Sequence, residues 1–182
     1  RSSAASDVYK RQMQSSASVI GSATNALVGV TVSNAGWTNI GQLTVGGSGS
    51  GSLTIGSGGT VAASGLLIAS NATSRGTVTL GDSNGVASLA LGNGSITFGA
   101  GTGNLIFNQR GALTVSNSIS SLTSGRGTIT SAGSGTTTLT ANNSRFSATT
   151  SLSAGTMVLG TGAQLGGSVN VANRNAFFAL NT

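Results

Sequence analysis

The chain has 182 residues, of which 5% are charged, 37% are hydrophobic and 30 are glycine, and its formal net charge is +6. It contains no Cys, His or Pro, which excludes a disulfide framework, a thiolate metal site and histidine-based catalysis. Recurring Leu, Ile and Val exclude the usual disordered composition, and no apolar run approaches the ~18 residues that a membrane-spanning helix needs.

The first twelve residues differ in composition from the rest of the chain, because they contain the only Lys, the only Tyr and one of the two acidic residues. Residues 2–12, SSAASDVYKRQ, match without a gap the translation of a transposase-type sequencing adapter; the alternative is a natural basic tail. We therefore predict an artefactual, disordered tail over residues 1–12 and a single domain over residues 13–182. Met13 is then expected to mark a fragment boundary. The domain keeps five Arg and one Asp, so its net charge is +4.

From residue 42 onward, short segments alternate apolar and polar residues. Apolar side chains stand two apart, as in Leu43/Val45 and Ile96/Phe98, which is the period of a strand with one buried face. Gly, Ser and Asn separate the segments, and Gly and Asn supply the positive φ angles of tight corners. The expected strands lie within residues 42–47, 52–59, 65–71, 76–85, 87–94, 94–103, 104–111, 111–118, 127–135, 136–143, 155–162 and 167–175.

These segments resemble one another, which favours stacked coils over a sandwich or a barrel. Large core residues are also scarce, with five Phe and one Trp. We predict an all-β parallel β-helix (β-solenoid) with two or three strands in each coil of about 20 residues. That length gives roughly eight coils and a rod about 40 Å long.

A recognisable stretch spans residues 127–160, GTITSAGSGTTTLTANNSRFSATTSLSAGTMVLG. It resembles the passenger-associated transport repeat of autotransporters, the bacterial type V secreted proteins. The matching residues are Gly127, Ile129, Gly133, Gly135, Leu139, Asn143, Phe146, Ala154, Gly155, Met157, Leu159 and Gly160. Ser131 stands where the repeat usually has Lys, and Ala141 and Ala148 replace two usual glycines. Residues 36–65 and 162–173 resemble other coils of the same passengers.

The resemblance implies a right-handed β-helix that is displayed outside the outer membrane. In that family the repeat is associated with coils that help the passenger to fold and to be secreted. Anchoring would be through a C-terminal translocation barrel, which this sequence is expected to lack. The expected function is a non-catalytic structural or adhesive passenger segment. Its expected partners are a host surface, a glycan or a neighbouring cell, and no nucleic acid.

Catalysis is not expected, because Asp82 is the only acid outside the tail and has no titratable partner. A serine nucleophile would need a base, and a pectate-lyase-like site would need several acids around Ca²⁺. We therefore predict no catalytic, cofactor-binding or metal-binding residues, and no cofactor. Asp82, in GDSNG, is interpreted as a turn former.

Three other features are interpreted as structural. GGSGSGS (46–52) lacks the Lys of a phosphate-binding loop and is predicted to form a coil corner. Trp37 is expected to be packed and not to stack on a sugar. The five arginines are isolated in sequence, which favours exposed corners over a nucleic-acid stripe. They are Arg75, Arg110, Arg126, Arg145 and Arg174.

An alternative function is a ligand-binding solenoid, for ice or polysaccharide, without catalysis. It rests on the pairs Thr77/Thr79, Thr128/Thr130 and Thr138/Thr140, which a solvent face of high β-propensity also explains. A binding face should carry matched rows of Thr or aromatic residues on consecutive coils. The last segment, residues 175–182, is predicted to expose Phe177, Phe178 and Leu180 and to promote end-to-end association.

Overall fold

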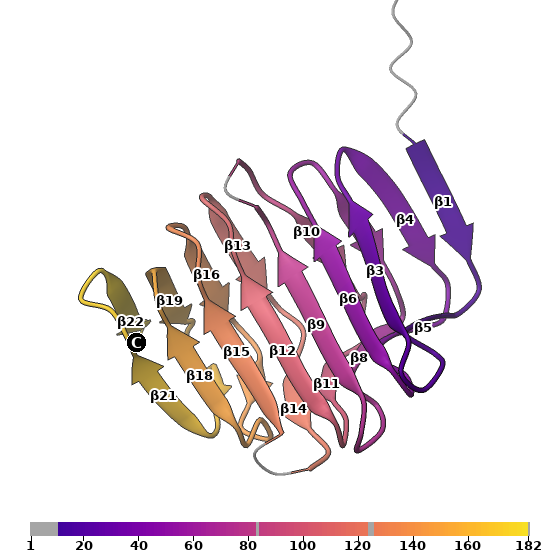
Figure 1. Cartoon of the computed structure of the whole chain (residues 1–182). Helices are drawn as coiled ribbons and strands as arrows, with labels where there is room; N and C mark the ends of the chain where they lie inside the picture. The colour runs from indigo at the N-terminus through magenta and orange to yellow at the C-terminus, as the bar shows by residue number, and fades with distance from the viewer. Residues whose placement is uncertain (1–10, 83, 124–125, 182) are drawn as a thin grey trace, which may run out of the picture.

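The computed structural model describes residues 11–82, 84–123 and 126–181, and these residues form parallel strands and connecting turns with no helix. The strands stack as a β-solenoid of about seven turns, which runs from β1 at one end to β22 at the other (Figure 1). The predicted fold class is confirmed, and the number of turns is close to the predicted eight. Coils vary in length, from 19 residues between stacked Thr149 and Ser168 to 30 between stacked Leu66 and Ile96.

Each turn contributes one strand to each of three faces. The first face contains β1 (Arg11–Ser15), β4 (Ala35–Asn39), β7 (Thr60–Ala62), β10 (Ser88–Ala90), β13 (Ala112–Val115), β16 (Thr136–Leu139), β19 (Gly155–Leu159) and β22 (Ala176–Leu180). The second contains β2 (Ser18–Ile20), β5 (Gln42–Val45), β8 (Gly65–Ile68), β11 (Ile96–Phe98), β14 (Ile119–Ser121), β17 (Asn142–Asn143) and β20 (Gln164–Leu165). The third contains β3 (Leu27–Val32), β6 (Ser50–Ile55), β9 (Arg75–Leu80), β12 (Thr102–Phe107), β15 (Gly127–Ser131), β18 (Thr149–Leu152) and β21 (Ser168–Val171).

The three faces differ in continuity. The third face is one seven-stranded sheet that runs from β3 to β21. The first face is divided between β10 and β13 into two four-stranded sheets. The second face is divided between β14 and β17 into sheets of five and two strands. The two breaks therefore lie at successive turns of the coil and on different faces.

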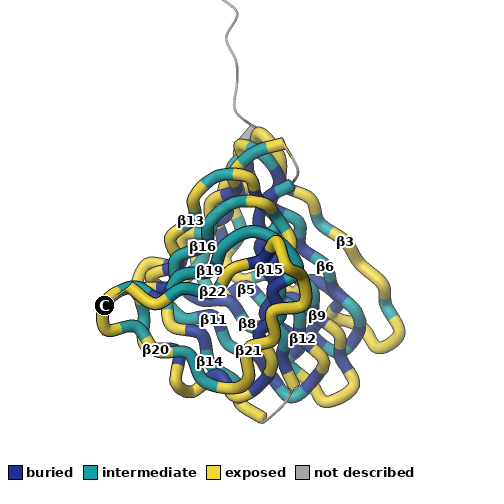
Figure 2. The backbone as a smooth tube through the Cα atoms, turned by 90° about the vertical axis from the view of Figure 1, so that its left-hand side faces the viewer, coloured by how far each residue is buried: buried dark blue, intermediate teal, exposed yellow. Residues whose placement is uncertain are grey.

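The core is built from rows of stacked aliphatic side chains. On the third face, Leu53, Val78, Leu105 and Ile129 occupy equivalent positions on four successive strands, and all are fully buried. In the view along the stack the outline is roughly triangular, with buried residues inside and exposed ones at the corners (Figure 2). Because each coil covers the next, one or two aliphatic residues per strand are enough to fill the interior.

Two aromatic rings pack against each other in this core. Phe98 and Phe146 are fully buried, with ring centroids 5.5 Å apart and an interplanar angle of 48°. The ring of Phe98 lies against two glycines of the third face, Gly103 and Gly127. A Cβ added at either residue would lie within 2.7 Å of the ring. The glycines therefore make room for Phe98.

Buried polar side chains join neighbouring coils. Trp37 is 4% exposed, and its indole N–H donates to Ser15 Oγ at 2.9 Å, which confirms that it is packed. Asn143 is 1% exposed; it accepts from the Ile119 N–H at 2.7 Å and donates to the Ala141 carbonyl at 2.9 Å. These asparagine bonds satisfy backbone groups at positions where the ladder of strand hydrogen bonds is interrupted.

Thr150 is an exception, because its hydroxyl is fully buried and has no hydrogen-bond partner among the described residues. It stacks between Ile129 and Val169 in an apolar row. We expect Thr150→Val to raise the free energy of unfolding by about 1–2 kcal/mol, since it removes an unsatisfied hydroxyl and keeps the branched shape. Thermal unfolding measures the change, and Thr54→Val, on the outward side of the same sheet, should have little effect. A lower midpoint for Thr150→Val would show that a buried water bonds the hydroxyl.

Two predictions need correction. The boundary predicted at residue 13 lies inside β1, because Arg11 and Gln12 pair with Ala35 and Gly36 of the next coil; the rest of the predicted tail lies outside the described residues. Phe178 is not fully exposed but packs partly against the core, since it stacks on the buried Met157. Phe177 and Leu180 are exposed as predicted, at 61% and 67%.

The strand prediction also has a gap at the start of the chain. The expected series began at residue 42, whereas the described residues form four further strands, β1 to β4, before that position.

The described residues contain no helix that is long and apolar enough to cross a membrane.

Candidate functional site

The outward surface of the third face carries regular rows of small hydroxyl side chains. Strand pairing places residues of seven successive strands in two rows, mostly Thr and Ser. The first row is Gly29, Ser52, Thr77, Asn104, Thr128, Thr149 and Ser168. The second row is Thr31, Thr54, Thr79, Ile106, Thr130, Ser151 and Asn170. We call these two rows the hydroxyl face.

The spacing on the hydroxyl face follows from strand geometry. Neighbouring strands lie about 4.7–4.9 Å apart, and residues two apart on a strand lie about 6.6–6.8 Å apart. Two side-chain hydrogen bonds occur on this face: Thr130 Oγ1 of the second row donates to Asn104 Oδ1 of the first row at 3.2 Å, and Thr149 and Ser168 of the first row are bonded at 3.2 Å. The rows contain no charged and no aromatic residue. The hydroxyl face therefore presents mainly hydroxyls and methyl groups to solvent.

The three Thr pairs predicted from the sequence do not share one face. Thr77/Thr79 and Thr128/Thr130 lie on the hydroxyl face, two coils apart. Thr138 lies on β16 of the first face, and Thr140 follows that strand. The first face has no comparable row, because Thr138 stacks between Thr114 and Val158. Matched rows are thus a property of the third face.

A second candidate lies at the break in the second face, between β14 and β17. No strand ladder joins these strands, because β14 ends one sheet and β17 pairs with β20 in another. The coils are held there by the Asn143 bond to Ile119 and by the Ser121 N–H, which donates to the Arg145 carbonyl at 3.1 Å. The break leaves a hollow of about 370 Å³. We call it the Arg145 groove.

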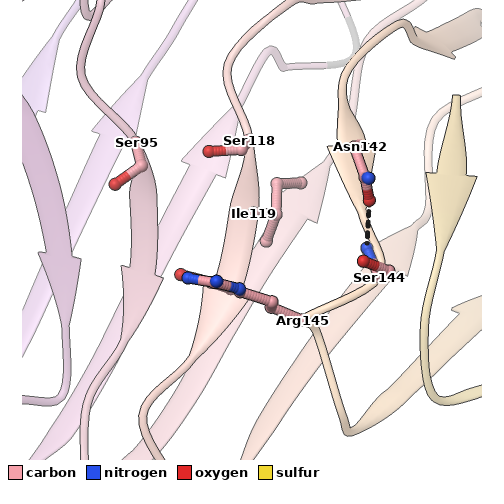
Figure 3. Close-up of a pocket in the computed structure, with 7 residues that line it drawn as sticks. Ser95, Ser118, Ile119, Asn142, Ser144 and Arg145 are labelled. Atoms are coloured by element: carbon pink, nitrogen blue, oxygen red, sulfur yellow. Dashed lines mark hydrogen bonds between the residues drawn. The ribbon is translucent and has the colours of Figure 1, made fainter.

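Polar side chains from three successive coils line the Arg145 groove. Its lining residues are Ser95, Ser118, Ile119, Ser120, Asn142, Ser144 and Arg145. Figure 3 shows the Arg145 side chain extending across the hollow from the coil of β17 towards the strand that carries Ser95. Asn142 Oδ1 accepts from the Ser144 backbone N–H at 2.9 Å, which fixes the turn before Arg145 (Figure 3). The groove thus combines one guanidinium group with several neutral hydrogen-bonding groups.

The five arginines are all exposed, as predicted. Arg75, Arg126 and Arg145 lie along the edge where the second face turns into the third, and Arg75 and Arg126 are two coils apart. Arg110 and Arg174 lie along the edge between the third and first faces. The positive charges are therefore divided between two edges of the rod.

Asp82 acts as the predicted turn former. Its Oδ1 accepts from the backbone N–H groups of Asn84 at 2.9 Å and Gly85 at 3.1 Å. Its Oδ2 accepts from the Ser57 N–H of the preceding coil at 2.9 Å, a link that the sequence did not predict. The Ser57 N–H foremost, with those of Asn84 and Gly85, lowers the pKa of Asp82 below its ordinary value of 3.8. All of its partners are backbone groups, as in a structural carboxylate.

The lowered pKa of Asp82 predicts how stability depends on pH. A carboxylate with a depressed folded-state pKa stabilises the fold above its unfolded pKa, and this contribution is lost as the pH falls through the folded pKa. Because Asp82 is the only acidic side chain of the described residues, we expect a constant denaturation midpoint from about pH 5 to 9 and a decline below about pH 4. Urea denaturation at a series of pH values measures this, and Asp82→Asn should reduce the decline. An equal decline in both proteins would contradict this role for Asp82.

Two sequence interpretations can be placed in the structure. Only residues 46–49 of GGSGSGS form the corner between β5 and β6, and residues 50–52 begin β6, so the predicted corner is shorter than expected. In this corner Gly46 has a φ of 82°, and a Cβ there would meet the Arg75 carbonyl. No cluster of three or more His, Cys, Asp or Glu occurs in the described part of the chain. The Arg145 groove was not predicted, because serines give no distinctive signal in sequence.

Comparison with known proteins adds no relative. No protein-family model matches the chain, and no curated protein and no solved structure is detectably similar to it. Functional inference therefore depends on the residues and their geometry.

Proposed function

We propose that the chain is a non-catalytic structural and adhesive segment of an autotransporter passenger, displayed outside the bacterial outer membrane. The observation that carries the proposal is the stretch 127–160, which resembles the passenger-associated transport repeat. Residues of this pattern lie in the core or at a tight corner of the coils. Ile129, Leu139 and Phe146 are fully buried in the core. Gly155 adopts a positive φ of 68° at a corner where a Cβ would meet the Gly133 carbonyl.

The chemistry of the chain supports a role without catalysis. The one acidic side chain of the described residues accepts three backbone hydrogen bonds and has no titratable partner within them. A chain without Cys cannot form disulfides before it crosses a membrane. A rod of stacked coils can instead extend and display a surface. We therefore expect no turnover of pectin, other polysaccharides, esters or peptides. Asp82→Asn should leave this lack of enzymatic activity unchanged.

Surface display tests the proposal directly. The chain is placed between an export signal and a translocation barrel in a Gram-negative host, and external protease is added. We expect the chain to reach the surface and to be removed by the protease. Retention inside the cell, despite export of a known passenger in the same vector, would contradict the proposal.

Deletion of single coils gives a matched control for the repeat. Removing residues 128–148 joins two stacked positions and deletes one coil within the repeat-like stretch, because Thr128 pairs with Thr149. Removing residues 43–65 does the same outside it, because Leu43 pairs with Leu66. If 127–160 assists secretion, the first deletion should lower surface display more than the second. Equal losses would remove the special role of the repeat-like stretch.

A second candidate function is ice binding by the hydroxyl face. The matched Thr and Ser rows on consecutive coils favour it, and the absence of aromatic side chains from these rows favours ordered water over sugar rings as the ligand. We expect thermal hysteresis that is lost in Thr79→Lys and kept in Thr138→Lys, on the first face. No hysteresis in the parent chain would eliminate this candidate.

A further inference from the structure

We propose that the Arg145 groove binds an acidic polysaccharide, with Arg145 holding a carboxylate or sulfate of one sugar unit. This inference rests on the proposed adhesive function and names the ligand class that the adhesive surface recognises. The groove has a volume of about 370 Å³, within the range of small-ligand sites, and is open to solvent along one side of the rod.

The charge of the groove favours an anionic ligand. Arg145 is the only charged residue in its lining. Asp82, the only carboxylate side chain of the described residues, lies on a different edge of the rod and is bonded to Ser57, Asn84 and Gly85. The Arg145 guanidinium therefore has no described carboxylate to neutralise it. Its planar N–H groups can form two parallel hydrogen bonds to a carboxylate or sulfate.

The neutral lining groups favour a sugar as the carrier of that charge. Ser95, Ser118, Ser120 and Ser144 each supply a hydroxyl, and a hydroxyl both donates and accepts hydrogen bonds. Sugar hydroxyls need partners of both kinds. The lining contains no aromatic residue, so a neutral sugar would lack a stacking surface, and the charge becomes the main source of affinity.

The arrangement of arginines favours a polymer over a single sugar. Arg75 and Arg126 lie on the same edge of the rod as Arg145. Arg75 begins β9 and Arg126 precedes β15, and these two strands are two coils apart in the stack, a distance of about 9–10 Å. A chain with repeated acidic groups can contact these side chains in succession. A single-stranded nucleic acid is also a polyanion, but it usually gains affinity from stacking on aromatic residues, and this edge offers none in the groove.

Calorimetric titration tests the proposal with defined probes. Oligogalacturonate, a sulfated glycosaminoglycan, neutral dextran, inorganic phosphate and single-stranded DNA are titrated into the full chain at low and at 0.15 M salt. We expect binding of at least one acidic polysaccharide, which phosphate competes for only weakly, and no binding of dextran. Equal or tighter binding of DNA, or binding of no probe, would overturn the proposal.

Matched variants separate a site from general attraction by positive charge. Arg145→Gln and Arg174→Gln each remove one charge, but Arg174 lies on the other edge of the rod. We expect about tenfold weaker binding for Arg145→Gln, as for the loss of a charge-assisted hydrogen-bonded pair, and little change for Arg174→Gln. Ser118→Leu, which fills the groove and keeps the charge, should also weaken binding. Equal effects of the two arginine variants would overturn the proposal.

Cell adhesion distinguishes a failure of this inference from a failure of the proposed function. If the displayed chain adheres to cells or matrix and Arg145→Gln adheres equally well, the groove assignment is wrong and the adhesive function stands. If the displayed chain adheres to nothing, the adhesive function fails. Binding of an acidic polysaccharide in calorimetry would then remain as a property of the groove alone.

Discussion

A dilution series of the 182-residue chain is expected to show association of copies head to tail. Both end coils leave core-facing side chains uncovered among the described residues: Met13 at one end is 50% exposed, and Val171 and Leu180 at the other are 48% and 67% exposed. Within the part of the chain that the structure describes, the third-face sheet also ends in unpaired strand edges at β3 and β21. A second copy can continue the parallel ladder at either edge, and such contacts do not close into a ring.

Light scattering or sedimentation measures the mass as a function of concentration. Val171→Lys should raise the concentration needed for association by about tenfold or more, because it places a charge in the end surface. Leu122→Lys is the matched control, since Leu122 is 71% exposed and follows β14 within the stack. A parent chain that stays monomeric at high concentration, or an equal effect of the two variants, would show that the end coils are already covered.

Gly127→Ala is expected to destabilise the fold by about 1–3 kcal/mol, although it adds a single methyl group. An added Cβ would lie 2.7 Å from Cγ and 2.8 Å from Cδ1 of Phe98. The ring is fully buried against Phe146, so it can move only by disturbing the centre of the core. Thermal or urea unfolding measures the loss.

Gly65→Ala is the control for glycine replacement in a strand. Gly65 begins β8, and the nearest atom to an added Cβ is the Ser95 carbonyl oxygen at 3.7 Å, an ordinary contact. It should be neutral or slightly stabilising. In a Phe98→Leu background, Gly127→Ala should cost less than in the parent chain. Additive effects of the two substitutions would show that the ring and the glycine do not compete for the same space.

Most of the third face could be predicted because its inward positions are apolar. Leu53, Val78 and Ile129 alternate with polar neighbours, and this period of two identifies the strands of the third face directly. The number of coils was overestimated slightly because corners vary in length. The coil between the stacked positions Leu66 and Ile96 is 30 residues long, and no coil of the repeat-like stretch is as long.

Strands β4 and β18 were missed because one inward position in each is polar, whereas β3 was missed although its inward residues Val30 and Val32 have the period of two. Asn39 in β4 and Thr150 in β18 are buried but interrupt the apolar period. Asn143 was recognised only as part of the repeat-like pattern, although it is a buried residue that joins two coils. A polar residue in a strand gives the same sequence signal whether it faces the core or solvent, so the pattern alone cannot assign its direction.

The two candidate surfaces were predictable to different degrees. The Thr pairs Thr77/Thr79 and Thr128/Thr130 suggested a hydroxyl array, but their register across coils depends on loop lengths that the sequence does not give. The Arg145 groove depends on a missing ladder between β14 and β17, and Ser95 and Arg145 come together only because of the coil lengths between them. The position of such a site depends on the lengths of the coils that precede it, which the sequence pattern does not give.

The offset of the two sheet breaks has a mechanical consequence. Between the turn of β10 and that of β13, the second and third faces still pair, and between the turn of β14 and that of β17, the first and third faces still pair. Every junction between complete turns therefore keeps at least two of its three ladders, but these two junctions keep fewer than the other junctions between complete turns. When the rod is pulled along its axis, these two junctions should therefore separate before the others. The third face would act as the hinge that keeps the separated blocks tethered.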